Sequence, residues 1–198
     1  MNEIKGKITN IRSRIMASKV KRKLDLSEIS IISMNCIGGV VYHDCEQLFL
    51  SPTINLYFMA SHFIKFINRL DYYCSLTPVI KMGDSFPIGT LDDINIFFMH
   101  YGSCEEALEK WEERKKRINY DKIFVIMVEQ NGFDEHDFEC FKELKYPKIL
   151  FTKTSLFDCK EAVYYPEFRS KKELPDLISG RHMYNHMKLV DMINRAYG

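Results

Sequence analysis

Short apolar runs separated by helical segments recur along this chain, and that alternation limits the folds it can adopt. The clearest runs are residues 29–34, 94–101, 123–128 and 148–151, which are rich in apolar side chains with little alternation. Such continuous runs are typical of strands covered on both faces, as in parallel sheets. We therefore predict a three-layer α/β/α sandwich with a mixed, mostly parallel sheet, to which residues 86–101 contribute an antiparallel pair.

The first part of the chain differs from the rest in charge. Residues 1–24 carry eight lysines and arginines and one acidic residue, a formal charge of +7. Because the 198-residue chain carries +1 in total, subtraction leaves −6 for the remainder. We predict two parts, a basic arm over residues 1–25 and a single α/β domain over residues 26–198.

Ile4, Ile8, Ile11, Ile15 and then Val20 or Leu24 recur at helical spacing in this arm, which predicts a basic amphipathic helix over residues 3–24. Two interpretations of its apolar face stay open. The face packs on its own domain or on a second subunit of a homo-oligomer, or it rests on an anionic membrane surface. It lacks the aromatic residues common in membrane-surface helices, which favours packing on protein.

Composition and spacing argue against several classes of protein. No apolar segment is long enough to cross a bilayer, and the N-terminus lacks the apolar stretch of a secretory signal. A cytoplasmic location is expected, either free or at the inner face of the membrane. The six cysteines form no C-x-x-C pair, so we expect reduced thiols rather than disulfides or a zinc site. No basic face typical of nucleic-acid binding is evident.

Familiar catalytic motifs are missing as well. The chain contains no G-x-G-x-x-G, no phosphate loop and no G-x-S-x-G, so dinucleotide enzymes, NTPases and α/β-hydrolases are not expected. It also lacks the D-x-D pair of many glycosyltransferases and the H-x-x-x-x-D of common lipid acyltransferases. His182 and His186 lie four apart, but no third ligand has matching spacing. We predict neither a metal nor a cofactor.

Polar turns follow four of the predicted strands, at residues 35–39, 100–103, 129–132 and 152–155. If the strands run parallel, all four turns meet at one edge of the sheet. Open α/β folds bind their ligands at that edge. The pattern therefore predicts the place of a site without naming its reaction.

The first of these turns contains Asn35 and Cys36, followed by Gly38 and Gly39 at the start of a predicted helix. Backbone amides in such a turn can bind an anion. A cysteine at a helix N-terminus can also become acidic and nucleophilic. Alternatively, Cys36 is an ordinary small buried residue, and the two glycines only allow a tight turn.

His100 and a group of cations are further candidates. His100 ends a strong strand, where it could serve as a general base or could be a core histidine bonded to a carbonyl. On the following helix, Lys110, Arg114 and Arg117 share one side at spacings of four and three. Either they clamp a phosphate or sugar acid beside His100, or they form ordinary ion pairs on a solvated face.

Five segments resemble the signature of an uncharacterised bacterial family, a domain of unknown function whose members are often labelled exopolysaccharide or capsular polysaccharide biosynthesis proteins. The segments are SMNCIGG at 33–39, LSPTINL at 50–56, PIG at 87–89, FMHY at 98–101 and KWEERKKRINY at 110–120. The resemblance covers about residues 29–165 and implies an α/β fold and a link to surface-glycan synthesis, without a mechanism. This chain has Met34 where similar sequences tend to have asparagine.

Two functions are expected from these residues and this resemblance. One is a glycosyl or acyl transferase that binds an anionic sugar, a nucleotide-linked sugar or an acyl donor at the strand ends. The other is a non-catalytic glycan-binding or scaffold protein recruited through the basic arm. The candidate catalytic residues are Cys36 and His100. The candidate substrate-binding residues are Asn35, Gly38, Gly39, Ser51, Thr53, Asn55, Tyr101, Lys110, Trp111, Arg114, Arg117 and Asn119.

Overall fold

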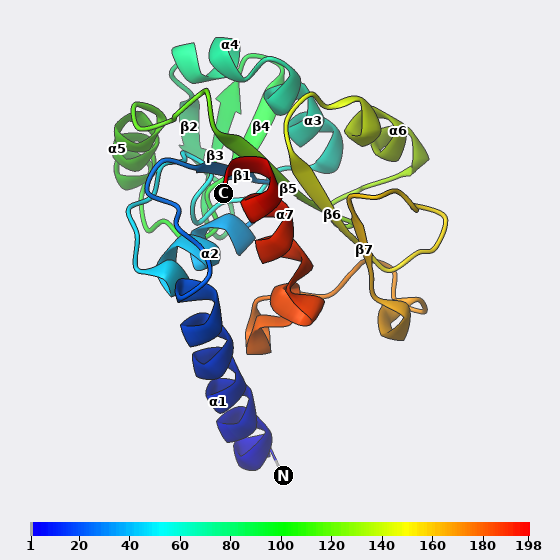
Figure 1. Cartoon of the computed structure of the whole chain (residues 1–198). Helices are drawn as coiled ribbons and strands as arrows, with labels where there is room; N and C mark the ends of the chain where they lie inside the picture. The colour runs from blue at the N-terminus through cyan, green and yellow to red at the C-terminus, as the bar shows by residue number, and fades with distance from the viewer. Residues whose placement is uncertain (1) are drawn as a thin grey trace.

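The computed structural model describes residues 2–198, and the side chains from residue 6 onward. Its strands form two sheets, a parallel one in the order β1-β5-β6-β7 and an antiparallel one in the order β2-β3-β4 (Figure 1). The strands are β1 (Ser30–Ser33), β2 (Val79–Met82), β3 (Pro87–Leu91), β4 (Ile94–Phe97), β5 (Ile123–Val128), β6 (Lys148–Thr152) and β7 (Ala162–Tyr164). The helices are α1 (Asn2–Lys21), α2 (Ile37–Cys45), α3 (Ala60–Asn68), α4 (Leu70–Ser75), α5 (Cys104–Lys115), α6 (Glu135–Glu143) and α7 (Lys188–Tyr197), with 3-10 segments η1 (Pro166–Phe168) and η2 (Ser179–Met187).

The predicted α/β class is confirmed, and the antiparallel strands have a sheet of their own. The run at 94–101 forms only the short strand β4, which turns back on β3 through Asp92 with a left-handed φ of 56°. β2 completes this sheet with exposed side chains such as Val79 and Met82. His100 therefore follows an antiparallel strand, and only three of the four predicted turns follow parallel strands.

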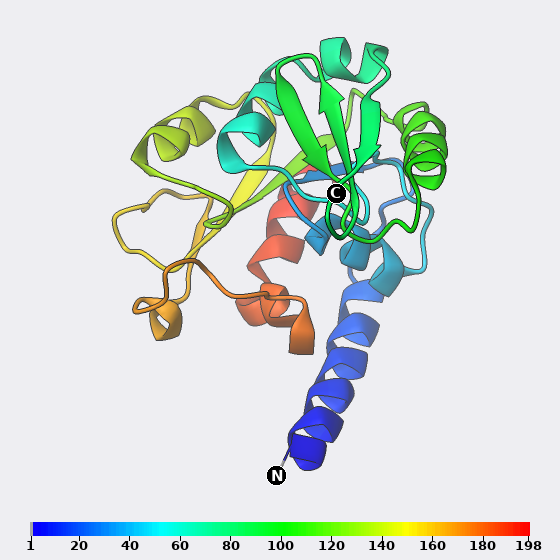
Figure 2. The same ribbon diagram turned by 180° about the vertical axis from the view of Figure 1, so that it is seen from behind.

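The parallel sheet is covered on both faces, as the continuous apolar runs of β5 and β6 require. Val125 and Met127 point to one core, beneath α3, α5, α6 and the antiparallel sheet. Ile126 and Val128 point to the other, beneath α2, η2 and α7. Figure 2 shows the antiparallel sheet lying over the parallel one on the far side from α7. This gives the predicted layers, with the small sheet as part of one of them.

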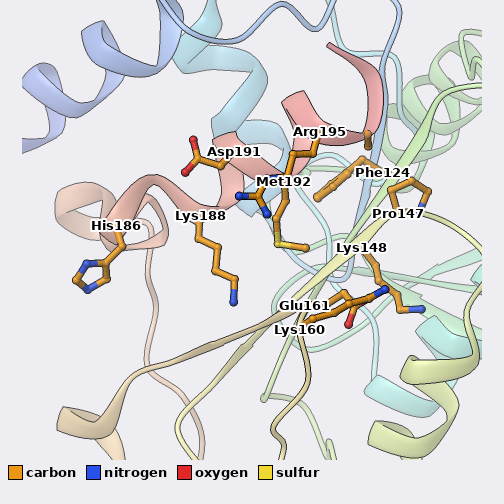
Figure 3. A pocket seen from close by; sticks show the side chains of 11 residues that line it. Phe124, Pro147, Lys148, Lys160, Glu161, His186, Lys188, Asp191, Met192 and Arg195 are labelled. Carbon is orange, nitrogen blue, oxygen red and sulfur yellow. The ribbon is translucent and has the colours of Figure 1, made fainter.

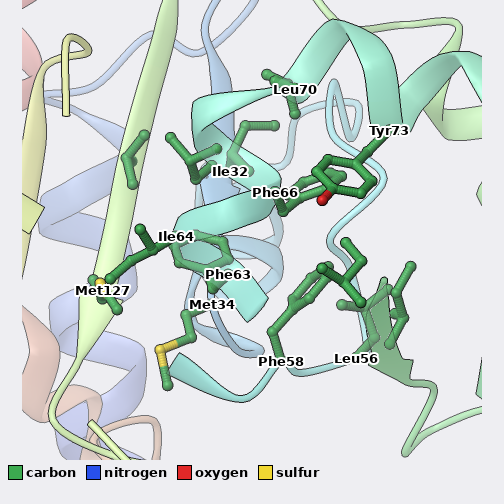
Figure 4. Packing of buried hydrophobic residues seen from close by; sticks show 14 of the residues in the cluster. Ile32, Met34, Leu56, Phe58, Phe63, Ile64, Phe66, Leu70, Tyr73 and Met127 are labelled. Atoms are coloured by element: carbon green, nitrogen blue, oxygen red, sulfur yellow. The ribbon is translucent and has the colours of Figure 1, made fainter. Parts of the chain in front are cut away.

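Aromatic side chains join the two sheets (Figure 4). Phe58 stacks on Phe66 of α3 with ring centroids 5.1 Å apart, and Phe66 also contacts Trp111 of α5 at 6.0 Å. The same cluster buries Ile32 and Met34 of β1. Each large aromatic buries enough apolar surface to contribute about 2–3 kcal/mol. Phe98, directly after β4, also contacts Trp111 at 6.3 Å, so the cluster holds the loop after β4 in place beside the end of β1.

Helix α1 leaves the domain, with its first turns extended away from it (Figures 1 and 2). Val20 near its end is fully buried, and Arg12 donates to the Gly180 carbonyl at 2.7 Å, so the later turns are docked on the body. The predicted apolar face is therefore buried only at its end, where Leu24 is buried like Val20, whereas Ile8, Ile11 and Ile15 are 61%, 59% and 51% exposed. The side chain of Ile4, the remaining member of that face, lies outside the described residues.

The C-terminal region is held by a buried ion pair. Arg181 donates twice to the carboxylate of Asp44, at 2.7 and 2.8 Å, and the Tyr184 hydroxyl bonds the same carboxylate at 3.0 Å. Residues 180, 181 and 186 have left-handed φ values, so η2 is irregular rather than an α-helix. His182 and His186 consequently do not share one face of a regular helix.

Candidate functional site

A hollow of about 500 Å³ opens at the carboxyl ends of β1 and β5. Asn35 and Cys36 come from the end of β1, and Gln130 and Asn131 from the end of β5. The remaining lining comes from the antiparallel sheet and the C-terminal loop: Tyr57, Met99, His100, Asp176 and Ile178. The strand order runs in one direction from β1 to β7, so the hollow lies between the two sheets rather than at a reversal of strand order.

Side-chain amides connect the two strand ends. Asn35 donates from Nδ2 to Gln130 Oε1 at 3.0 Å, while its Oδ1 accepts from the Ile37 amide at 3.1 Å. Gln130 donates to the Leu174 carbonyl at 2.6 Å, and Asn131 donates to the Phe58 carbonyl at 3.2 Å. These bonds fix the amides before any ligand binds, which reduces the conformational entropy lost on binding.

A buried ion pair supports the same edge from below. Glu129, which is 7% exposed, accepts from Thr152 Oγ1 at 2.6 Å and from the Lys153 amide at 2.8 Å. Lys153 Nζ lies 2.7 Å from its other oxygen. The predicted turn at 152–155 is therefore joined to the end of β5, although it does not line the hollow.

Cys36 begins α2 and is half-buried at the side of the hollow. Its Sγ lies 3.9 Å from both the Leu56 carbonyl and Met99 Sδ. Burial, with a smaller contribution from the Asp176 carboxylate, raises the pKa of the Cys36 thiol to about 11. This direction runs against the acidified thiol that the sequence suggested, because desolvation disfavours the thiolate.

His100 lines the same hollow as Cys36, and the structure thus brings the two candidate catalytic residues together. His100 is exposed, and its backbone amide donates to the Asn55 carbonyl at 3.4 Å. Within the described residues its imidazole has no hydrogen-bond partner, so both ring nitrogens are open to a ligand or to water.

Asp176 is the one lining residue that carries a full charge at neutral pH, since the other eight are amides, an imidazole, a phenol, a thiol or apolar groups. Its carboxylate accepts from the Ile178 amide at 2.9 Å and from the Ser179 amide at 3.3 Å. The hollow is therefore largely apolar in surface, with polar groups set among its apolar side chains and a slight negative charge.

The predicted cationic clamp does not reach this hollow. Lys110 pairs with Glu113 at 3.1 Å, and Arg117 pairs with the same carboxylate. Arg114 donates to the Tyr101 hydroxyl at 2.6 Å, and its guanidinium lies 5.3 Å from the ring centre of Phe49. The interactions match the interpretation as structural pairs on a helix.

Tyr101 and the loop at 51–55 support the site from behind. The Tyr101 hydroxyl donates to the Ile54 carbonyl at 2.8 Å. Thr53 Oγ1 accepts from the Ser33 amide at 2.9 Å and lies 3.0 Å from Ser51 Oγ, so both hydroxyls are buried in the link to β1. Asn55 is exposed with a left-handed φ of 61°. None of the four lines the hollow.

Four further candidates have packing roles. A side chain at Gly38 would place its Cβ 2.9 Å from that of Ser33, so glycine permits the close approach of α2 to β1. Gly39 packs in the same way, 3.3 Å from Ile54. Trp111 is buried in the core. Asn119 bonds Ser30 Oγ at 2.8 Å, at the opposite edge of the sheet.

Sequence reasoning missed Tyr57, Met99, Asp176 and Ile178. Tyr57 forms an isolated bridge to Phe97 and stacks on its ring at 4.7 Å, a contact between segments with no shared motif. Asp176 lies in a loop without periodicity, so no signal marked it. Gln130 and Asn131 belonged to a turn that the sequence did mark, although neither was chosen as a site residue.

The described residues lack two further features. They contain no cluster of three or more histidine, cysteine, aspartate or glutamate side chains able to hold a metal ion. Nor does any of their helices combine the length and apolar character needed to cross a membrane.

Nearly the whole chain is similar to known proteins. The model of a family described as a domain of unknown function, DUF1919, matches residues 7–195. An "Uncharacterized protein" of Haemophilus influenzae (strain Rd) is 33% identical over 196 residues, covering 94% of this chain and 95% of that protein. Neither description names a glycan or a reaction. Both sheets and every residue of the hollow lie within the match, and the chain belongs to the DUF1919 family.

Proposed function

We propose that the hollow at the carboxyl edge binds a hydroxyl-rich sugar and that the chain is a transferase in the assembly of a surface polysaccharide. The observation that carries this proposal is the lining itself, in which Asn35, Gln130, Asn131 and Asp176 surround an open imidazole. Amides and carboxylates pair with sugar hydroxyls as donors and acceptors. The link to polysaccharide rests on the resemblance of the sequence segments.

A neutral sugar fits this lining better than the anionic one expected from the sequence. The only full charge is the carboxylate of Asp176, which would repel a phosphate or a sugar acid. The sequence predicted that three cations would neutralise such a group. These cations, Lys110, Arg114 and Arg117, do not line the hollow.

In this proposal His100 accepts the proton of an acceptor hydroxyl as general base, while the hydroxyl oxygen bonds to the transferred carbon of the donor and the nucleotide or thiolate of the donor leaves with its bonding electron pair. The resulting imidazolium is stabilised by the carboxylate of Asp176, which lines the same hollow. Cys36 contacts the sugar as a neutral thiol, because its pKa is raised to about 11. The amides of Asn35 and Gln130, already fixed by their mutual hydrogen bond, orient the sugar.

Ligand-observed NMR on the full chain tests this function with glucose, galactose and N-acetylglucosamine, their UDP derivatives, and acetyl-CoA. The sugar parts should show saturation transfer. Transfer to an acceptor sugar should fall about 100-fold in His100→Ala, with binding little changed. His136→Ala, an exposed histidine on α6, is the matched control and should behave as wild type.

Three results would argue against the transferase. If no sugar binds, the proposal fails. If sugars bind without any transfer under all donor conditions, the chain is a binding protein. If His100→Ala and His136→Ala transfer equally well, His100 is not the base.

A second function, membrane recruitment, is favoured by the exposed stripe of Ile8, Ile11 and Ile15 on α1. At helical periodicity Arg14 lies along one border of this stripe, and Arg12 and Lys19 lie along the other. An aliphatic stripe between cations suits the surface of an anionic bilayer. In this alternative the chain is a glycan-binding scaffold brought to the membrane by its basic helix.

Vesicle flotation tests whether the stripe on α1 binds a membrane or a second subunit. The full chain should float with phosphatidylglycerol vesicles and not with phosphatidylcholine vesicles. Ile8→Ser/Ile11→Ser/Ile15→Ser should lose flotation, whereas Val79→Ser/Met82→Ser/Leu156→Ser, which removes equally exposed apolar groups elsewhere, should retain it. If the first triple variant instead converts a dimer to a monomer in light scattering, the stripe is a subunit contact.

A further inference from the structure

A second hollow, of about 560 Å³, opens at the amino edge of the parallel sheet (Figure 3). Its strand side is formed by the starts of β5 and β6 and by residues 160–161, just before β7. Its other side is one face of α7, from which Lys188 extends toward the strands. No residue lines both this hollow and the one at the carboxyl edge, so the two are separate.

Positive charge is in excess here. Four cations, Lys148, Lys160, Lys188 and Arg195, face two carboxylates, Glu161 and Asp191, a formal balance of +2. An excess of cations in a concave site attracts anions, because the field is concentrated by the low-dielectric walls.

Not all of these cations are engaged by the protein. Lys148 Nζ bonds the carbonyls of Lys142 and Leu144, at 2.8 and 2.6 Å, and so closes the end of α6. Lys188 gives one hydrogen to the Ala162 carbonyl at 2.5 Å and keeps two. Lys160 is 90% exposed and lies 3.6 Å from Glu161.

Arg195 has no hydrogen bond or ion pair with any residue that the structure describes. Its five N–H donors are therefore available to a ligand, and their planar arrangement suits a phosphate. Lys160, Lys188 and Arg195 together offer donors from both walls of the hollow.

The floor between these cations is apolar. Met192 of α7 and Pro147 before β6 line it, together with Ala196 and the buried ring of Phe124. A thioether and small apolar groups pack well against a flat ring. Asp191 of α7 is at the border of the hollow, and its carboxylate is an acceptor suited to sugar hydroxyls.

We propose that this hollow binds a nucleoside phosphate, with its base on the apolar floor and its phosphates toward Lys160, Lys188 and Arg195. A carboxylate beside the floor accepts from the ribose hydroxyls. A phosphate without a ring would leave the floor empty, and a nucleoside without phosphate would leave the excess cations unpaired. The site is independent of the sugar pocket.

Isothermal titration calorimetry of the full chain tests the proposal with ADP, UDP, inorganic phosphate and adenosine. One of the diphosphates should bind at least about tenfold more tightly than phosphate or adenosine. Lys160→Gln/Arg195→Gln should weaken that binding by about tenfold or more, because two charge-assisted contacts are lost. Arg169→Gln/Lys172→Gln removes the same charge from exposed positions outside the hollow and should change the affinity less than about twofold.

Several outcomes would overturn the site. Absence of ADP and UDP binding would do so, as would inorganic phosphate binding equally tightly. Equal weakening in the two double variants would show general electrostatic attraction rather than a site. Loss of nucleotide binding in His100→Ala would place the nucleotide at the carboxyl edge instead, whereas unchanged binding there keeps the two proposals separate.

Discussion

The two edges of the parallel sheet carry different chemistry. At the carboxyl edge a buried ion pair, Glu129 with Lys153, lies beneath a pocket whose lining is neutral apart from Asp176. At the amino edge the cations of β6 and α7 exceed their carboxylates, and Arg195 has no partner among the described residues. Charge that is neutralised internally leaves a site for hydroxyls and amides, whereas uncompensated charge leaves a site for anions.

The largest expected effect is the loss of stability on breaking the buried Glu129–Lys153 pair at the carboxyl edge. Lys153→Met should lower the free energy of unfolding by about 3 kcal/mol, because it leaves Glu129 buried without its counter-charge. Urea denaturation measures the change. Lys122→Met, which breaks the exposed pair with Glu28, should cost no more than about 0.5 kcal/mol. Equal costs for the two variants would mean that the buried pair has no special role.

A smaller effect is expected at the amino edge. Lys148→Met should lower the free energy of unfolding by about 1–2 kcal/mol, because the carbonyls of Lys142 and Leu144 lose their donor while the aliphatic stem is preserved. The same urea titration applies, with Lys145→Met on the exposed turn as control. If Lys148→Met lowered the free energy of unfolding more than Lys153→Met does, the amino edge would contain the more strongly stabilising lysine, contrary to this account.

Cys36 gives a test by pH. Since its pKa is raised from 9.0 to about 11, the thiolate fraction should rise about tenfold per pH unit from pH 7 to 9.5. Iodoacetamide labelling followed by peptide mass spectrometry should therefore show a rate that climbs over this range without a plateau. A plateau below pH 8 would mean an acidic, nucleophilic thiol, contrary to the burial that the structure describes.

The smallest effects concern the exposed ligand-binding side chains. His100→Ala at one edge and Lys160→Gln/Arg195→Gln at the other should each change the free energy of unfolding by no more than about 0.5 kcal/mol. The expectation follows because no described residue bonds these side chains, apart from the long Lys160–Glu161 contact. A thermal melt checks both variants, and a loss above about 1 kcal/mol would indicate a structural role.

Much of the carboxyl edge could be predicted from the sequence. Continuous apolar runs identified β1, β5 and β6, and parallel pairing then brings Asn35 near Gln130 without further information. The run containing β4 was harder, because an apolar segment of that length has the same composition in a parallel or an antiparallel strand. His100 still reaches the hollow, although by a different route from the one predicted.

The roles of the cations could not be read from spacing. Helical periodicity shows that Lys110, Arg114 and Arg117 share one side of α5, but not which element that side meets. The structure pairs Arg114 with Tyr101 and the other two with Glu113. Asp176 and Arg195 line the two hollows only because of the tertiary fold, and no local sequence pattern predicts either residue as part of a site.

Hydrogen–deuterium exchange of the full chain, with and without a saturating neutral sugar, tests the central claim most directly. We predict slower exchange in the segments around residues 35–37, 99–100, 130–131 and 176–178, which come together only at the carboxyl edge. Exchange near residues 186–196 should stay unchanged. Two results would contradict a sugar site at the ends of β1 and β5: protection confined to residues 186–196, or no protection in any of these segments.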